Sequence, residues 1–290
     1  MINNNIINKI SKLLNNKKII KYKLISNSFD INCVKIFFKE EIYIAKYYAK
    51  KKYAFNAILS EANNLKYFYK KKIKHFPRII FNNNKYLITE YILNNNKIPN
   101  KTNKDFIEAI INIHSILNNF YGFPFNTQIG GVEHKNNKND NWASFYAETR
   151  LYYFLNILNK KNLIDLKSSK KIEKIILKIN DFIPQKPQSR LMHGDLWEGN
   201  ILFNNYVFNG FIDPGSFYGH NEMELAYLRW FNPQFVDKNF LNIYNDYISI
   251  DKNYKNYEPI YQLYYALCNL ALWDKSYIKE VNRLLKKIGI

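Results

Sequence analysis

Glycine is scarce in this chain: nine of its 290 residues are glycine, and none precedes Gly122. Five of the nine lie within the window 194–219. A sequence so poor in glycine is expected to keep it where the backbone needs a positive φ or a close approach to a ligand. This window is therefore the part of the chain most expected to carry chemistry.

Cysteine is also scarce, and long hydrophobic runs are missing. Cys33 and Cys268 lie far apart in sequence, which argues against a disulfide framework or a CxxC metal site. No stretch approaches the ~20 apolar residues of a membrane span, and the first ten residues lack the apolar core of a signal peptide. We expect a cytoplasmic chain without a membrane partner.

Acidic residues are few, with 24 Asp and Glu against 43 Lys and Arg, so the formal net charge is +19. Such a charge can indicate a nucleic-acid or anionic-membrane partner. Here the Lys residues are spread along the chain among Asn and Ile, and they form no arginine-rich arm or basic helix face. We interpret the charge as compositional bias and expect no specific nucleic-acid partner.

Hydrophobic residues make up 47% of the chain, enough for one large core or two modest lobes. In the first third, residue periodicity predicts helices over 3–18 and 53–70 and strands at 31–38, 41–48, 78–81 and 86–92. This is a small, mostly antiparallel sheet with one helix inserted.

The polar segment 94–100 is interpreted as a linker. Beyond it, helices are predicted at 102–119, 141–159, 168–180, 222–231, 237–249, 258–273 and 275–287. The exception is 201–213, where the pattern predicts a β-hairpin that turns at Asn204-Asn205.

The glycine-rich window holds a spaced set of polar residues: the sequence HGDLWEGN at 193–200, the predicted hairpin, and then Asp213. Phosphoryl transfer needs a positioned nucleophile and cations that neutralise phosphate charge. Asp195 can accept the proton of an acceptor hydroxyl. Asn200 and Asp213 supply the hard oxygen ligands that Mg²⁺ shares with substrate phosphates. Each feature alone is a weak signal, but the spaced set is a strong one.

This set resembles the catalytic loop and the metal-binding Asp of the protein-kinase-like superfamily. HGD in place of HRD points to the aminoglycoside-phosphotransferase-like branch, whose members phosphorylate small molecules. HGDLWEGN followed by FIDPGSFYGHNEMELA is most similar to the fructosamine kinase family, also called ketosamine-3-kinases. The likeness extends to segments 121–123 and 142–151 and covers nearly the whole chain.

The resemblance implies an α+β, protein-kinase-like bilobal fold. A small antiparallel-sheet lobe (1–93) would bind nucleotide, and a larger, mostly helical lobe (94–290) would carry catalysis and the acceptor. ATP and Mg²⁺ would be the cofactors.

The resemblance also implies roles for residues on the nucleotide side. Lys46 would contact the α- and β-phosphates, and Glu61 on the following helix would pair with it. Tyr91 would lie at the hinge that holds adenine. Asn200 and Asp213 would hold magnesium.

On the acceptor side, the resemblance implies that Asp195 is the catalytic base. Trp197, His220, Glu222 and Glu224 would lie near the sugar. Two alternatives remain open: Trp197 could pack under the loop, and Glu222 and Glu224 could favour a helix N-terminus through its dipole. His193 is interpreted as structural.

The sequence departs from the family at the loop that covers the nucleotide. The family has a Gly-rich loop there, whereas segment 26–32 (SNSFDIN) has no glycine. Asn, Ser and Asp tolerate turns, so we expect a formed loop with looser phosphate contacts and weakened ATP affinity.

The sequence thus predicts an ATP-dependent kinase of free or protein-bound ketosamines, most simply a monomer, with a role in deglycation repair. One alternative is a kinase for another small hydroxyl compound, such as an aminoglycoside, choline or homoserine. Another is a weakly active ATP-binding regulator, which the missing glycines favour. A basic nucleic-acid-binding module is a distant third.

Overall fold

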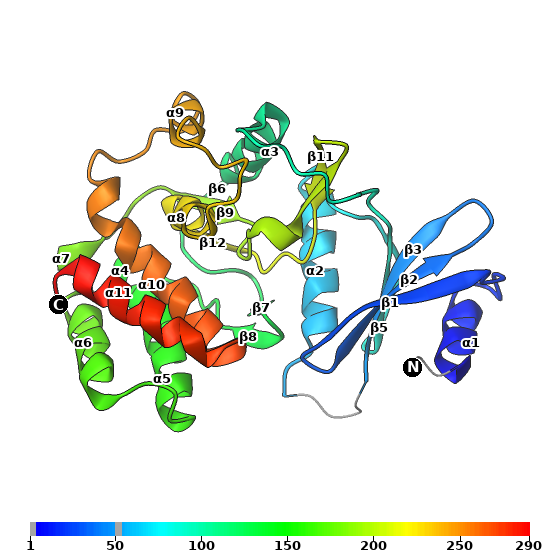
Figure 1. Ribbon diagram of the computed structural model, residues 1–290, viewed down its shortest axis with the longest axis horizontal. Coiled ribbons are helices and arrows are strands. Elements are labelled where there is room, and N and C mark those ends of the chain that lie inside the picture. The colour runs from blue at the N-terminus through cyan, green and yellow to red at the C-terminus, as the bar shows by residue number, and fades with distance from the viewer. Residues whose placement is uncertain (1–3, 50–53) are drawn as a thin grey trace. The chain divides into compact units, whose positions relative to one another are not determined.

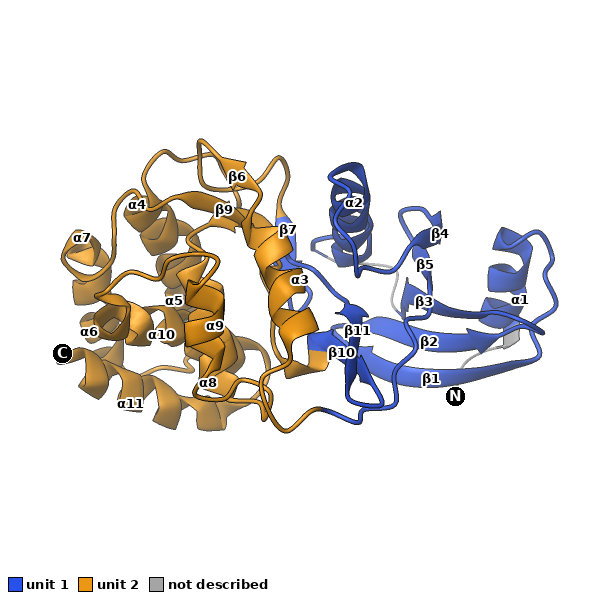
Figure 2. Cartoon of the chain, turned by 90° about the horizontal axis from the view of Figure 1, so that it is seen from above, with its two compact units in different colours: residues 1–98, 127–133, 200–215 blue, residues 99–126, 134–199, 216–290 orange. Residues whose placement is uncertain are grey.

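The computed structural model describes residues 4–49 and 54–290. The chain forms two compact units, coloured separately in Figure 2. The first comprises residues 1–98, 127–133 and 200–215, and the second comprises 99–126, 134–199 and 216–290. The sequence-based division after residue 93 treated each lobe as one continuous stretch. The structural division differs from this one because residues 127–133 and 200–215 pack with the first unit.

The first unit is built on a five-stranded antiparallel sheet in the order β1-β2-β3-β5-β4 (Figure 1, with β4 labelled in Figure 2). The strands are β1 (Lys21–Ser28), β2 (Ile31–Phe37), β3 (Ile42–Tyr48), β4 (Ile79–Asn82) and β5 (Tyr86–Glu90). The predicted strands are confirmed within a residue or two. Strand β1 was not predicted because nearly all its side chains are exposed, so it lacks a buried-and-exposed alternation.

Each face of this sheet is covered by a helix. On one face, Ile10 of α1 (Asn4–Leu13) belongs to a core with Val34, Ile36 and Ala45. On the other, α2 (Ala57–Lys70) packs Ile58, Ala62 and Leu65 near Leu87. Side chains alternate along a strand, so Lys46 in β3 points to the α2 face while Ala45 points to the α1 face.

Two further hairpins belong largely to the first unit. β7 (Thr127–Ile129) pairs with β8 (Val132–His134), and β10 (Ile201–Asn204) pairs with β11 (Val207–Phe211). The second hairpin turns at Asn205-Tyr206, where both residues have positive φ. The turn therefore lies one residue later than Asn204-Asn205, the position expected from the sequence.

The second unit is mostly helical, with a three-stranded sheet of β6 (Leu117–Asn118), β9 (Ser189–Met192) and β12 (Phe217–Gly219). Its helices are α3 (Lys104–His114), α4 (Trp142–Tyr146), α5 (Tyr153–Lys160), α6 (Leu166–Leu177), α7 (Ile179–Phe182), α8 (Glu222–Phe231), α9 (Phe240–Asn245), α10 (Tyr254–Leu272) and α11 (Ile278–Ile288). A π-helical segment (Ala147–Tyr152) joins α4 to α5. The predicted helix at 222–231 is confirmed. The one predicted over 102–119 is shorter, because strand β6 takes its end.

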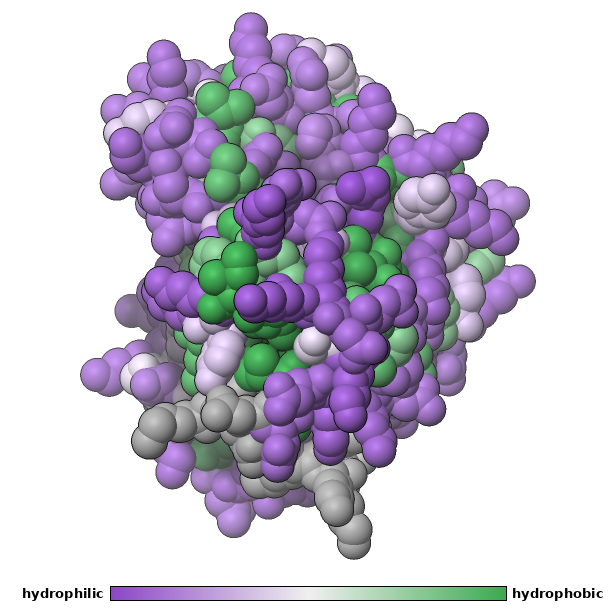
Figure 3. All heavy atoms as spheres, turned by 90° about the vertical axis from the view of Figure 1, so that its right-hand side faces the viewer, coloured by the Kyte–Doolittle hydropathy of each residue, from purple (hydrophilic) through white to green (hydrophobic). Residues whose placement is uncertain are grey.

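Hydrophilic residues cover most of the face drawn in Figure 3, with a smaller group of hydrophobic residues near its centre. Among the described residues, no helix is long and apolar enough to cross a membrane.

Candidate active site

Three charged side chains meet on the α2 face of the first unit's sheet. The Lys46 ammonium donates to both carboxylate oxygens of Glu61, at 2.8 Å each. It also donates to Oδ1 of Asp213. The pairing of Lys46 with Glu61 that the resemblance implied is therefore present. The strand, the helix and the end of the β11 hairpin each contribute one member.

Local structure explains how each residue reaches this point. The side chain of Asn56 caps α2 by accepting from the backbone N–H of Leu59 at 3.0 Å, which fixes the start of the helix that carries Glu61. Asp213 follows β11 with φ at +56°. Asp is among the few residues enriched in this left-handed region, and strained conformations cluster at functional sites.

The electrostatics follow from two carboxylates that share one ammonium in a buried place. Burial lowers the pKa of Lys46, but the charges of Asp213 and Glu61 raise it by a larger amount. The net shift is therefore upward, and the side chain is charged. Burial raises the pKa of Glu61 to about 7, with Lys46 opposing the shift and Asp213 adding to it. Cys33 pairs across from Lys46 in the sheet, and burial raises its thiol pKa to about 12, so it stays protonated.

Asn200 lies beside the end of the same hairpin. Its backbone carbonyl accepts from the N–H of Ile212 at 3.1 Å, which brings it next to Asp213 in space. The described residues contain no cluster of three His, Cys, Asp or Glu that could hold a metal unaided. One amide and one carboxylate, the latter 36% exposed, fit Mg²⁺, which completes its coordination with water and substrate phosphates.

Tyr91 lies directly after β5, and its backbone N–H donates to the carbonyl of Ile42 at 3.1 Å. Its hydroxyl donates to the carbonyl of Asn94 at 3.2 Å. The Lys35 ammonium lies 3.4 Å from the centre of its ring, a cation–π contact. The segment proposed as a hinge is thus tied to β3 and β2. The adenine-binding role of Tyr91 stays a prediction.

The HGD loop of the second unit is held by one buried carboxylate. Glu224 accepts from the backbone N–H of His193 at 3.0 Å and from that of Gly194 at 2.7 Å. His114 Nε2 lies 3.0 Å from the same carboxylate. Burial raises the pKa of Glu224, but the hydrogen bond and charge of His114 and the Gly194 N–H lower it more, so it is ionised.

Asp195, the predicted base, has a partner that sequence reasoning missed. The Tyr227 hydroxyl lies 3.4 Å from its Oδ1. Burial first, and then the charge of Asp195, raise the pKa of Tyr227 well above its ordinary value, so the phenol keeps its proton and can donate. The Tyr227 ring stacks on Tyr265 with centroids 3.6 Å apart. Nothing in the local sequence around Tyr227 signals its contact with Asp195, which depends on how α8 packs against the HGD loop.

Trp197 is the most exposed of the predicted acceptor residues, at 37%. Its ring lies 5.8 Å from that of Phe231 and covers Gly199, where an added Cβ would fall 2.3 Å from the indole. Glycine at 199 is therefore needed for the indole to lie in this place. The exposed part of the ring is compatible with the acceptor platform that the sequence suggested.

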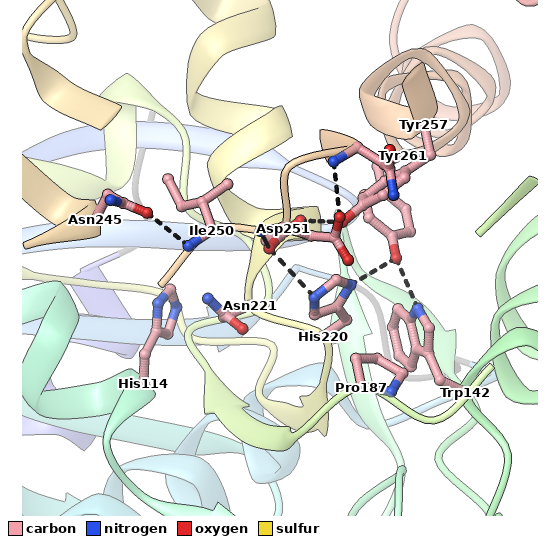
Figure 4. A network of polar contacts seen from close by, with 12 residues as sticks. His114, Trp142, Pro187, His220, Asn221, Asn245, Ile250, Asp251, Tyr257 and Tyr261 are labelled. Carbon is pink, nitrogen blue, oxygen red and sulfur yellow. Dashed lines mark hydrogen bonds and ion pairs between the residues drawn. The ribbon is translucent and has the colours of Figure 1, made fainter. Parts of the chain in front are cut away.

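His220, Glu222 and Glu224 lie in the core of the second unit, each 5% exposed or less. Figure 4 shows the network around His220: its Nδ1 lies 2.8 Å from the Tyr261 hydroxyl, which also accepts from Trp142 Nε1 at 2.9 Å. Glu222 accepts from the Asp251 N–H at 2.7 Å and from the Tyr257 hydroxyl. Of the three, Glu224 contacts the HGD loop, whereas the contacts of His220 and Glu222 tie together other parts of the second unit. Their direct contact with acceptor stays a prediction that burial does not favour.

The predicted site residues thus divide between the units. Lys46, Glu61, Tyr91, Asn200 and Asp213 belong to the first unit. Asp195, Trp197, His220, Glu222 and Glu224 belong to the second.

Comparison with known proteins identifies the family. The family model described as fructosamine kinase matches residues 3–289. The chain belongs to the fructosamine kinase family.

Among curated fructosamine kinase relatives, a probable ketoamine kinase of Enterococcus faecium is 30% identical over 209 residues, which cover 69% of this chain and 71% of that protein. A chloroplastic protein-ribulosamine 3-kinase of Arabidopsis thaliana is 27% identical over 160 residues, 54% of this chain and 47% of that protein.

Solved structures confirm the kinase-like fold of this fructosamine kinase family member. A Thermobifida fusca protein described as a fructosamine-3-kinase superposes with a TM-score of 0.84 at 18% identity, over 97% of both chains. An aminoglycoside phosphotransferase with bound ADP superposes with a TM-score of 0.64 at 17% identity, over 99% of this chain and 98% of the other. At such identities the likeness concerns the fold alone.

Proposed function

We propose that this chain transfers the γ-phosphoryl group of ATP to the C3 hydroxyl of the sugar of a ketosamine, of the fructosamine or ribulosamine type. The observation that carries the proposal is the cluster of Lys46, Glu61 and Asp213. A lysine–glutamate pair beside a metal-binding Asp is the arrangement by which protein-kinase-like enzymes orient ATP. Relatives named ketoamine kinase and ribulosamine 3-kinase support the acceptor class.

On the nucleotide side, Lys46 contacts the α- and β-phosphates, held in place by Glu61. Asn200 and Asp213 hold Mg²⁺, which when bound neutralises the charge on the phosphates. Tyr91 lies at the hinge that binds adenine. The donor set of one amide and one exposed carboxylate supports this assignment, because Mg²⁺ takes its remaining ligands from water and phosphate.

On the acceptor side, Asp195 takes the proton of the C3 hydroxyl as the sugar oxygen attacks the γ-phosphorus. The bond between that phosphorus and the bridging oxygen breaks, and ADP leaves. Glu224 holds the HGD loop through two backbone N–H groups. Trp197 packs on the sugar or its linker.

The product, a ketosamine 3-phosphate, favours elimination of the sugar from the amine. A role in deglycation repair, on free or protein-bound amines, therefore forms part of the proposal. So does a cytoplasmic location, where ATP is supplied.

The test is ADP release by the purified chain with a panel of fructosamines, ribulosamines and erythrulosamines, beside aminoglycosides and choline. We expect turnover with ketosamines and a phosphorylated C3 in the product by NMR. Turnover with aminoglycoside or choline alone would favour the other small-molecule kinases. Nucleotide binding without turnover on any acceptor would favour the regulator.

A further inference from the structure

Two hairpin tips meet within the first unit. The β1–β2 hairpin turns at Phe29-Asp30, and the β7–β8 hairpin turns at Gly130-Gly131. All four residues have positive φ, from 50° to 74°, as two-residue type I′ turns require. A Cβ built on Gly131 would fall 2.6 Å from Cβ of Phe29 and 3.0 Å from its Cγ. The Phe29 side chain therefore lies directly against the backbone of Gly131.

The first of these turns is made of unfavourable residues. Type I′ turns prefer Asn-Gly or Asp-Gly, and a bulky side chain at positive φ is an outlier that persists only where its surroundings fix it. The Phe29 ring against Gly131 is one such constraint. A second is the Ala49 N–H, which donates to the Asp30 carbonyl at 2.6 Å. The turn is thus held from both sides.

The second turn has no room for a side chain at 131. The atom that an added Cβ would meet is Cβ of Phe29, which cannot move without the backbone. Gln128 fixes the turn further, because its side-chain oxygen accepts from the Gly131 N–H at 2.9 Å. Glycine is therefore required at 131 for two reasons: its φ is positive, and Phe29 occupies the space where a side chain would lie.

The β7–β8 hairpin also reaches the rest of the charged cluster. β7 packs against α2, the helix that carries Glu61. The Thr127 hydroxyl donates to the carbonyl of Gly215, two residues after Asp213, at 3.1 Å. One small hairpin therefore touches the tip of the glycine-free loop, the helix of Glu61 and the segment that follows Asp213.

We propose that Phe29 is a positioning residue for nucleotide binding: its ring, seated on Gly131, holds the loop 26–32 over the ATP phosphates. This inference rests on the proposed function, since it takes that loop to be the nucleotide loop. A Gly-rich loop covers phosphates by flexibility and close approach, whereas this loop is held by a side-chain contact to a second hairpin. This contact thereby offsets the loss of ATP affinity that is expected of a loop without glycine.

The test is a double-mutant cycle of Phe29→Ala and Gly131→Ala, read by calorimetric binding of Mg–ATP and of adenosine. We expect each single change to weaken Mg–ATP binding by about tenfold, the low end for loss of one apolar contact. Adenosine binding should hardly change, since it has no phosphates. The double variant should bind no more weakly than Gly131→Ala alone, because the Cβ added at 131 already displaces the Phe29 side chain and the contact is lost in both.

Two controls make the result specific. Phe29→Leu keeps an apolar side chain on Gly131 and should recover most of the affinity. Leu24→Ala changes an exposed residue of the same hairpin, 40% exposed, and should leave Mg–ATP binding unaltered.

Additive losses in the cycle, or equal losses for ATP and adenosine, would overturn the positioning role and leave the proposed function intact. A lower melting temperature for Phe29→Ala with unchanged Mg–ATP affinity would also overturn it, since the contact would then serve folding alone. A wild-type chain that binds no Mg–ATP would instead remove the proposed function, and this inference with it.

Discussion

The ammonium of Lys46 lies 2.8 Å from both carboxylate oxygens of Glu61. Both side chains are largely buried, at 14% and 7% exposure. The pair crosses from the sheet to α2, so it joins β3 to the helix that covers this face of the sheet.

Removing one member of this pair should destabilise the fold. Lys46→Met leaves Glu61 buried without its partner, and we expect a loss of about 3–5 kcal/mol in the free energy of unfolding. Lys46→Met with Glu61→Leu should lose less than the sum of the single changes, because Glu61 then no longer stays as a buried charge without its partner. Urea denaturation measures the free energy of unfolding of the single and double variants. Lys85→Met, at an exposed position, is the control. Additive effects would show that the pair is not coupled.

Asp195→Asn should abolish most turnover while ATP still binds. A general base contributes typically ~10²–10⁴-fold, and the amide cannot take the acceptor proton. Steady-state kcat with a ketosamine measures the loss of turnover, and calorimetry measures whether ATP still binds. Near-normal kcat in this variant would withdraw Asp195 from catalysis.

Asp213→Ala should remove metal-dependent nucleotide binding. We expect ATP affinity in the wild-type chain to fall on adding EDTA and to be restored by Mg²⁺ or Mn²⁺. The variant should bind ATP weakly under both conditions, whereas Asp195→Asn should respond to metal as the wild type does. Equal wild-type affinity with and without EDTA would contradict the metal site.

Glu224→Gln should alter the acid side of the stability profile. The folded pKa of Glu224 lies below its ordinary value of 4.5, so as pH falls the unfolded chain takes up the proton first. The stability that the carboxylate contributes is therefore complete above pH 4.5 and is lost below it. In the variant this part of the acid slope should disappear.

At neutral pH, Glu224→Gln should lose about 1–3 kcal/mol, since the two loop N–H groups bond to different carboxylate oxygens and one of these becomes an NH₂ donor in the amide. Melting temperatures from pH 3 to 7 measure the effect, and Glu108→Gln on the exposed side of α3 is the control. An unchanged acid slope would show that Glu224 does not hold the loop as a carboxylate.

Trp197→Ala should discriminate acceptors rather than nucleotides. If the exposed indole packs on the sugar, its loss should lower kcat/KM for the acceptor about 10–200-fold, which corresponds to about 1–3 kcal/mol in transition-state binding. The KM for ATP should change little. Two ketosamines that differ in sugar length should be affected unequally. A uniform loss for both, with a lower melting temperature, would show that Trp197 only covers Gly199 and supports the loop.

Local pattern and motif spacing predicted much of this molecule. The alternation in β2 and β3 was visible because each buries one face, and Lys46 stood out as a charge within an apolar strand. β1 left no pattern because its side chains are exposed. The start of α8 was located from sequence, but the burial of Glu222 and Glu224 depends on packing against α10 and the HGD loop.

Two contacts between distant segments escaped prediction. Tyr227 beside Asp195 and Phe29 on Gly131 join residues 32 and 102 positions apart, and neither has a local signal. Gly131 could be noted from the sequence because glycine is rare in this chain. Its partner was not, because only the folded chain shows which side chain fills the space beside it.

The make-up of the first unit has a consequence for synthesis on the ribosome. Residues 1–98 emerge first, yet the unit also needs 127–133 and 200–215. At about 5–20 residues per second, the nascent chain waits on the order of ten seconds before Asp213 can join Lys46 and Glu61. During the first part of that interval the unit lacks both of its later hairpins, and until residue 215 is added it still lacks the second. Synonymous codon changes between 98 and 215 that slow elongation should therefore lower the yield of folded protein more than equal delays after residue 215.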